Sequence, residues 1–315
     1  MRKVRRKTGA VIMVSLLILL AAVATIFSLY VESSQNSSGV TRRATDYLAA
    51  NYNPSIGMIS ETQKGSAYFV YSDNFLAAYV LGGSSNSTLR AIAANITSTD
   101  ERYLATVSDP ESQYQVVSSS NGSFFASNNY VLARVGSSVI ETTLNNGTSP
   151  LSPSSYADIA FLEALYWHQV HGGYVFNEFT LGVHLYDGRG FVDNASSGGV
   201  YQTYKLALYD YVGKVVGAVL PRDLDANLAK LQAPDGGFYT GYTSDFSPIG
   251  STNTETTSLA ILALSTPAAK VAQPYSSYLP VFISAIAAIV LVEVVVLRRR
   301  SKRRRRLPKS PVQFS

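Results

Sequence analysis

Residues 234–239 read Pro-Asp-Gly-Gly-Phe-Tyr, and residues 259–264 read Leu-Ala-Ile-Leu-Ala-Leu. A glycine-rich turn is followed here by a polar loop and then by an apolar segment of helical character. The same order occurs twice earlier, where the turns at 53–58 and 188–191 each precede an apolar segment. The spacing between these units is irregular, so it does not indicate a strict repeat array. It predicts stacked helical hairpins whose loops gather on one face.

Apolar residues spaced three to four apart predict helices along most of the segment 32–275. The most regular pattern runs from Val200 to Leu220 and ends there because Pro221 cannot continue a helix. The other predicted helices cover residues 41–51, 73–81, 87–96, 155–171, 224–231 and 254–265. Between residues 113 and 145 the apolar period changes to two, and β-leaning segments flank a Gly-Ser turn. This region predicts a small antiparallel β insert.

Two short motifs carry a resemblance to known proteins. Residues 232–238, Gln-Ala-Pro-Asp-Gly-Gly-Phe, with the apolar helix that follows, resemble one repeat of the α/α-toroid family. That family includes terpenoid cyclases, protein prenyltransferase β-subunits and the thioester domain of α2-macroglobulins. The step Tyr-Ser-Asp-Asn at residues 71–74 is similar to one in uncharacterised archaeal membrane-anchored surface proteins.

The resemblance implies a mainly α fold. We expect a reduced or incomplete α/α toroid of helical hairpins with a β insert at about 113–145, flanked by N- and C-terminal transmembrane helices. The activities of the family are disfavoured, because the chain has no cysteine for a prenyltransferase zinc site or a thioester. The nearest match to a cyclase aspartate motif, residues 223–225, lies at a predicted helix start, where aspartate is an ordinary cap.

Two apolar runs predict membrane spans; the first carries no charge, and the second carries only Glu293, near its basic end. Residues 9–31 reach about 34 Å as a helix and residues 279–297 about 28 Å, and both lengths suit a bilayer core. Basic residues adjoin the outer ends of both runs, in the segments 1–8 and 298–315. The positive-inside rule then places both basic segments in the cytoplasm, the second as an Arg-rich tail, and residues 32–275 outside the membrane.

The first apolar run has a second interpretation. Its Ala-Val-Ala sequence at residues 22–24 follows a plausible signal-peptide core, so cleavage there would remove the N-terminus. We favour an uncleaved signal anchor, because the apolar run continues to Val31.

Charge is distributed unevenly along the chain. The formal net charge is +5, but the basic ends leave the segment 32–275 with −8. The high isoelectric point therefore does not indicate a nucleic-acid partner. The expected partners are membrane lipid and, at the cell surface, envelope glycans or other surface proteins. The same segment holds the glycosylation sequons at Asn36, Asn86, Asn95, Asn121, Asn146 and Asn194.

Carboxylates near the predicted loop face are candidates for acid–base chemistry. Glycosidases and polysaccharide lyases use paired carboxylates in such a position. The candidate catalytic residues are Glu61, Asp73, Glu178, Asp235 and Glu255, with Asp187 and Asp245 on the same face. The alternative is that several of them only order loops by accepting backbone N–H groups at helix starts.

The three histidines are clustered. His168 and His171 have the spacing of one helical face, and His184 follows closely enough to complete a zinc site with a nearby carboxylate. The alternative places His171 as an ordinary cation at a helix C-terminus, before Gly172. No other cofactor is expected.

Three functions follow from these observations. We expect a non-catalytic binding or structural module anchored at the cell surface. The first alternative is a carbohydrate-active hydrolase or lyase with loop-face carboxylates. The second is a metal-dependent enzyme built on the histidines. Paired ionisable groups that converge would favour the first alternative over the module.

Overall fold

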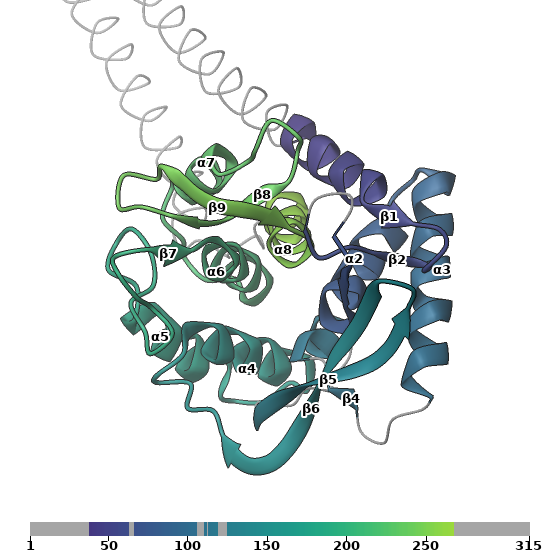
Figure 1. The fold of residues 1–315 in the computed structure, drawn as a ribbon. Coiled ribbons are helices and arrows are strands. Elements are labelled where there is room, and N and C mark those ends of the chain that lie inside the picture. The colour runs from purple at the N-terminus through teal and green to yellow at the C-terminus, as the bar shows by residue number, and fades with distance from the viewer. Residues whose placement is uncertain (1–37, 63–65, 106–109, 112, 119–124, 268–315) are drawn as a thin grey trace, which may run out of the picture. The chain divides into compact units, whose positions relative to one another are not determined.

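The computed structural model describes residues 38–62, 66–105, 110–111, 113–118 and 125–267 (Figure 1), which all belong to the unit ending at Ala269. The apolar runs 9–31 and 279–297, both basic ends, Asn36 and Asn121 lie outside the described residues. Within the described ranges, no helix combines the length and apolar character that crossing a membrane requires.

Helices form the centre of the described structure. Residues 38–50 form the first helix. The others are α2 (Tyr71–Gly82), α3 (Ser87–Leu104), the 3₁₀ helix η1 (Gln113–Val117), α4 (Ala157–Gln169), α5 (Val175–His184), α6 (Thr203–Val216), α7 (Leu224–Lys230) and α8 (Thr254–Ser265). In Figure 1, α6 and α8 lie side by side, with α4 and α5 on one side of them and α2 and α3 on the other.

The helices α2, α4, α6 and α8 run parallel, with their first turns at one end. The Tyr204 hydroxyl of α6 donates to Asp158 Oδ2 of α4 over 3.0 Å, which joins those first turns. At the opposite end, Lys214 Nζ of α6 donates to the Ala263 carbonyl of α8 over 2.7 Å. Near the same end, Tyr79 of α2 lies close to Tyr211 of α6. Burial and, to a lesser extent, the interaction with Tyr79 raise the pKa of Tyr211 to about 12.

The sequence sets the ends of these helices. The Asn253 side chain caps α8 by accepting from the Thr256 N–H over 2.9 Å, the arrangement that asparagine favours. Gly217, with φ of 75°, ends α6 in the left-handed conformation. Between them the helices bury an apolar core in which the rings of Phe161 and Tyr209 stack 5.4 Å apart.

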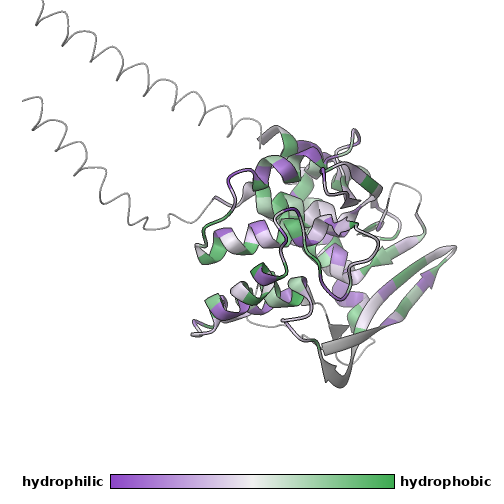
Figure 2. Ribbon diagram, turned by 90° about the vertical axis from the view of Figure 1, so that its left-hand side faces the viewer, coloured by the Kyte–Doolittle hydropathy of each residue, from purple (hydrophilic) through white to green (hydrophobic). Residues whose placement is uncertain are grey.

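Three small sheets connect and flank the helices in the described part. The strands are β1 (Tyr52–Asn53), β2 (Met58–Ile59), β3 (Tyr68–Val70), β4 (Pro110–Glu111), β5 (Phe125–Val135), β6 (Ser138–Pro150), β7 (Tyr201–Gln202), β8 (Phe238–Tyr242) and β9 (Pro248–Asn253). The β5–β6 hairpin is antiparallel and turns at Gly136, as predicted. Figure 2 shows it projecting from the helices, with hydrophilic and hydrophobic segments alternating along it.

The predicted mainly α toroid of helical hairpins is wrong. The described chain is mixed α/β, and its small sheets lie between helices that the prediction joined by loops. The glycine-rich segment at 236–250 illustrates the cause, because β8 and β9 pair their backbones antiparallel there. Its side-chain pattern lacks the strict alternation of a half-buried strand, so the sequence read as a turn.

The individual helices were predicted better than their assembly. The helix at 254–265 has the predicted bounds, and α3 extends eight residues beyond the predicted end, to Leu104. The predicted helix 155–171 is two residues too long at each end, because α4 covers only Ala157–Gln169. The separate helix α5 was not predicted.

Candidate functional site

Three carboxylates lie in the first turns of parallel helices. Asp73 belongs to α2, Asp158 to α4 and Glu255 to α8, and Glu61 precedes β3. Their electrostatic interactions place Glu61 and Asp158 beside Glu255, and Glu255 beside Asp73. We call these four carboxylates, with the phenols of Tyr114 and Tyr204, the acid–tyrosine cluster.

Glu255 is the centre of this cluster. The Tyr114 hydroxyl donates to Glu255 Oε1 over 2.5 Å. Burial raises the pKa of Glu255 to about 7, and the negative charges of Asp158 and Glu61 act in the same direction while the Tyr114 hydrogen bond opposes them. A carboxyl group with this pKa is present in both protonation states near neutral pH, as a general acid requires.

Asp73 and Glu61 are also shifted toward the protonated form. Asp73 is 5% exposed, and burial with the charges of Glu255 and Glu61 raises its pKa well above the usual range. Burial and the Glu141 carboxylate raise the pKa of Glu61, against a hydrogen bond from the Asn253 side chain. Crowded carboxyl groups cannot all ionise, so the cluster holds shared protons at neutral pH.

A buried ion pair supports the other side of the cluster. Lys205 Nζ lies 2.5 Å from Asp193 Oδ2 and 3.9 Å from Asp158 Oδ1. Asp193 Oδ2 also accepts from the Ala157 N–H at the start of α4, over 3.0 Å. Burial opposes ionisation of Asp193, but its hydrogen bonds from Lys205 and Ala157 lower the pKa below the usual range. Lys205 is therefore held by Asp193 in a position beside Asp158.

The cluster combines enclosed and accessible groups. Asp73 and Tyr114 are buried, as is the adjoining Lys205, whereas Glu61, Asp158, Tyr204 and Glu255 are half-buried. The N-terminal ends of parallel helices carry partial positive charge, which stabilises anionic groups placed there. This arrangement can hold ionised and protonated carboxyl groups side by side, with solvent contact at the half-buried ones.

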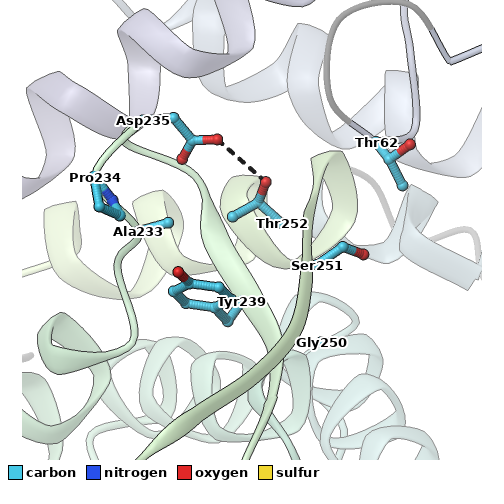
Figure 3. A pocket seen from close by; sticks show the side chains of 8 residues that line it. All are labelled: Thr62, Ala233, Pro234, Asp235, Tyr239, Gly250, Ser251 and Thr252. Atoms are coloured by element: carbon cyan, nitrogen blue, oxygen red, sulfur yellow. Dashed lines mark hydrogen bonds between the residues drawn. The ribbon is translucent and has the colours of Figure 1, made fainter.

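Asp235 lines a pocket of about 540 Å³ (Figure 3). Thr252 Oγ1 donates to Asp235 Oδ2 over 3.4 Å, and the Gly237 N–H donates to Oδ1 over 3.0 Å. Tyr239 comes from β8, and Thr62 lies across the pocket from Asp235 (Figure 3). Thr62 and Thr252 directly adjoin Glu61 and Asn253 in the chain, but no residue of the acid–tyrosine cluster lines the pocket.

Glu178 lies elsewhere, on α5. Its neighbour is Glu163 of α4. Burial, together with the charge of Glu178, raises the pKa of Glu163 to about 7. Burial also raises the pKa of Glu178. These two carboxyl groups face each other from antiparallel helices, apart from the convergent first turns.

Asp187 and Asp245 order loops. Asp187 Oδ2 accepts from the Tyr201 hydroxyl over 2.6 Å, and Oδ1 accepts from the Arg189 and Gly190 N–H groups. Asp245 is exposed and accepts from the Thr243 hydroxyl and from Ser247. For both residues the structure supports the loop-ordering alternative.

The histidines sit at helix ends. His168 is in the last turn of α4, His171 follows that helix with φ of 54°, and His184 ends α5. Across the described residues, no group of three or more histidine and acidic side chains is arranged to hold a metal ion.

Of the glycosylation sequons, Asn86, Asn95 and Asn194 are exposed. Asn86 also caps α3 by accepting from the Thr88 N–H, and Asn146 lies in β6.

Several residues of the site were missed from sequence. Tyr114 and Tyr204 gave no signal, because tyrosine is common throughout the chain. Asp158 was not among the candidates named from sequence; it is the second residue of α4, which begins at Ala157, whose N–H is bonded to Asp193. The available signal was the shared placement of Asp73, Asp158 and Glu255, each in the first turn of an apolar helix.

Comparisons of the chain with protein-family models, with curated proteins and with solved structures found no match in any of the three.

Proposed function

We propose that the protein is a carbohydrate-active hydrolase or lyase that works by general acid–base catalysis at the acid–tyrosine cluster. The observation that carries this proposal is Glu255, a half-buried carboxyl group with a pKa of about 7 and three further carboxylates around it. Glu255 is not used as a helix cap, since Asn253 caps α8. Converging ionisable groups are what an acid–base enzyme needs and a purely structural module does not.

The chemistry assigns different tasks to the carboxyl groups. Glu255, when protonated, gives its proton to the oxygen of the leaving group. Asp158 lies beside Lys205 and accepts a hydrogen bond from the Tyr204 hydroxyl. It takes a proton from water in a hydrolase, or from the carbon next to a carboxylate in a lyase. The pocket at Asp235 has room for a sugar unit, with hydroxyl groups, the Asp235 carboxylate and the Tyr239 ring as its polar and aromatic contacts.

The location proposed for this activity is outside the membrane. The apolar runs at 9–31 and 279–297 and the basic residues beyond them support a membrane anchor with residues 32–275 on the extracytoplasmic side. Envelope glycans are then the accessible substrates.

The test is the release of products from an array of envelope glycans. Glu255→Gln keeps the shape of the side chain and removes its proton, so we expect turnover to fall by about 10²–10⁴-fold with binding retained. Glu163→Gln is the matched control, because Glu163 is also half-buried with a pKa of about 7 but lies outside the cluster. Equal loss in both variants, or no turnover of any glycan by the unchanged protein, contradicts the proposal.

The second candidate is a non-catalytic glycan-binding module. The pocket of Figure 3 favours it, because Asp235 is the one carboxylate that lines it. Binding without product release, abolished by Asp235→Asn and unaffected by Glu255→Gln, would identify this second function.

A further inference from the structure

Large apolar side chains are exposed at the end of the helices opposite the acid–tyrosine cluster. Tyr79, in the last turn of α2, is 43% exposed, and Val219, just after α6, is 81% exposed. The turn between α4 and α5 exposes Val170 and Tyr174, and the first turn of α5 exposes Phe176; Tyr174 is 55% and Phe176 61% exposed. Since α2, α4 and α6 run parallel, all these side chains lie at their C-terminal ends.

The turn between α4 and α5 is built around aromatic rings. Trp167 lies 5.3 Å from the ring of Tyr166 and 5.1 Å from that of Tyr174, measured between ring centroids. Gly172 permits this packing, because a Cβ atom there would lie 2.3 Å from Trp167 Cε3. We call Trp167, Val170, Tyr174 and Phe176 the aromatic tip. Tyr174 and Phe176 are thus exposed at the surface, and Trp167 lies half-buried beside Tyr174.

The chain leaves the described structure at the same end. Helix α8 runs parallel to α6 and ends at Ser265, and the apolar run at 279–297 begins 12 residues after Pro267. That length of chain spans at most about 40 Å. If the run enters a membrane, as in the proposed function, the C-terminal end of α8 stays close to the bilayer surface.

The chemistry of this end fits the boundary between lipid headgroups and acyl chains. Tryptophan and tyrosine are enriched at membrane interfaces, where the ring is apolar on one side and polar on the other. Arg222, exposed beside Pro221 in the connection after α6, adds a cation for anionic headgroups. Asp223, next to it, accepts a hydrogen bond from Asn227 over 3.0 Å.

We infer that the aromatic tip rests in the membrane interface and holds the acid–tyrosine cluster on the side facing away from the lipid. The inference depends on the membrane anchor of the proposed function. It does not depend on the catalytic activity. The partner is the lipid surface itself. The β5–β6 hairpin pairs with β3, which directly precedes α2, so the hairpin lies at the end of the helices opposite the aromatic tip.

Trp167 is the single tryptophan of the chain and so reports the contact directly. The full-length protein is reconstituted into vesicles of phosphatidylcholine and phosphatidylglycerol, with or without phosphatidylcholine brominated near the start of its acyl chains. Bromine quenches tryptophan only at short range, so we expect loss of Trp167 emission in the brominated vesicles. Acrylamide in the buffer gives an independent readout, because membrane contact lowers its quenching of Trp167.

Two variants control the measurement. Replacing Tyr174 and Phe176 together by serine removes the exposed rings, and we expect bromine quenching to fall while the protein still floats with the vesicles. The pair Trp167→Phe and Tyr130→Trp moves the probe to β5, where Tyr130 is 47% exposed, and we expect no bromine quenching there.

The outcomes separate the two proposals. A protein that floats with vesicles but shows unchanged Trp167 emission in brominated lipid keeps the anchor and overturns the contact. Equal quenching of the probe on β5 overturns the orientation. A full-length protein that does not float with vesicles overturns both the anchor and the contact, and leaves the catalytic proposal to its own test.

Discussion

Tyr114 and Glu255 are 141 positions apart in the chain, and the hydroxyl of the first donates a 2.5 Å hydrogen bond to the carboxylate of the second. The bond links η1 to the first turn of α8. It lowers the pKa of Glu255 against the larger opposing effect of burial. Tyr114 therefore moves the pH range in which Glu255 holds its proton toward lower pH.

Tyr114→Phe tests this relationship. Removing a hydrogen bond to the charged form raises the pKa of Glu255 above about 7. If Glu255 is the general acid, activity on the alkaline side of the pH–rate profile extends to higher pH, because the acid stays protonated longer. Tyr130→Phe, on the exposed face of β5, is the control and leaves the profile unchanged. A profile that does not move in Tyr114→Phe argues against Glu255 as the acid.

The ion pair between Lys205 and Asp193 is predicted to be essential for stability. Lys205 is 1% exposed and the Asp193 side chain is fully buried, so Asp193→Asn leaves an ammonium group buried without its nearest counter-charge. We expect a loss of about 3–5 kcal/mol in the free energy of unfolding, measured by urea denaturation.

Two further variants interpret that measurement. Asp46→Asn, on the exposed face of the first helix, is expected to change stability by less than about 0.5 kcal/mol. Combining Asp193→Asn with Lys205→Met removes the unpaired charge and should recover part of the loss. If the double variant is as unstable as the sum of the single ones, the charge pair is not the cause.

The local patterns of the sequence predicted the elements that depend on neighbours in the chain. The helix at 254–265 follows from an asparagine cap and an unbroken apolar run, both visible in the sequence. The β5–β6 hairpin follows from a change of period around Gly136. The arrangement of these elements did not follow, because β3 pairs with β6 in parallel across about 70 residues of chain, and no local pattern encodes that choice.

The candidate site was predictable to the same degree. Glu61, Asp73 and Glu255 were named from the sequence, and the structure brings them together. Glu178 and Asp235 were named on the same grounds and lie apart from them. The difference depends on which helices pack in parallel, since only then do their first turns meet. A list of acidic residues near loops cannot contain that information.

Gly236 is predicted to be necessary for packing the first helix. Its φ is 96°, and a Cβ atom there would lie 2.3 Å from the Arg43 carbonyl oxygen. Gly188 has the same φ of 96°, but nothing lies within 4 Å of its Cβ position. The two glycines therefore separate backbone strain from steric contact.

Alanine at each position makes the comparison. Gly188→Ala should cost about 1–2 kcal/mol from the left-handed conformation alone. Gly236→Ala adds a clash with backbone that cannot rotate away, so we expect a clearly larger loss in thermal or urea unfolding. Hydrogen exchange should also show faster opening of residues 38–50 in that variant alone. Equal losses would mean that the first helix shifts without cost.

Asp100 is predicted to make the stability of the protein fall as the pH rises. Its side chain lies in α3, the residue is 7% exposed, and among the described residues its Oδ1 atom has no hydrogen-bond partner. Burial, and to a lesser extent the charge of Glu101, raises its pKa from 3.8 to about 8. Between these two values the folded state keeps a proton that the unfolded state has released, so stability decreases with increasing pH.

Asp100→Asn replaces the protonated acid by a neutral group that does not titrate. Relative to the unchanged protein, the variant should gain up to about 1.4 kcal/mol for each pH unit across that window, measured by urea denaturation at several pH values. The other raised carboxyl groups titrate in both proteins, so the difference isolates Asp100. Asp245→Asn is the control, because hydrogen bonds from Thr243 and Ser247 lower the pKa of Asp245 and its effect changes only at more acidic pH. A difference between Asp100→Asn and the unchanged protein that stays constant with pH would show that Asp100 is ionised in the folded state.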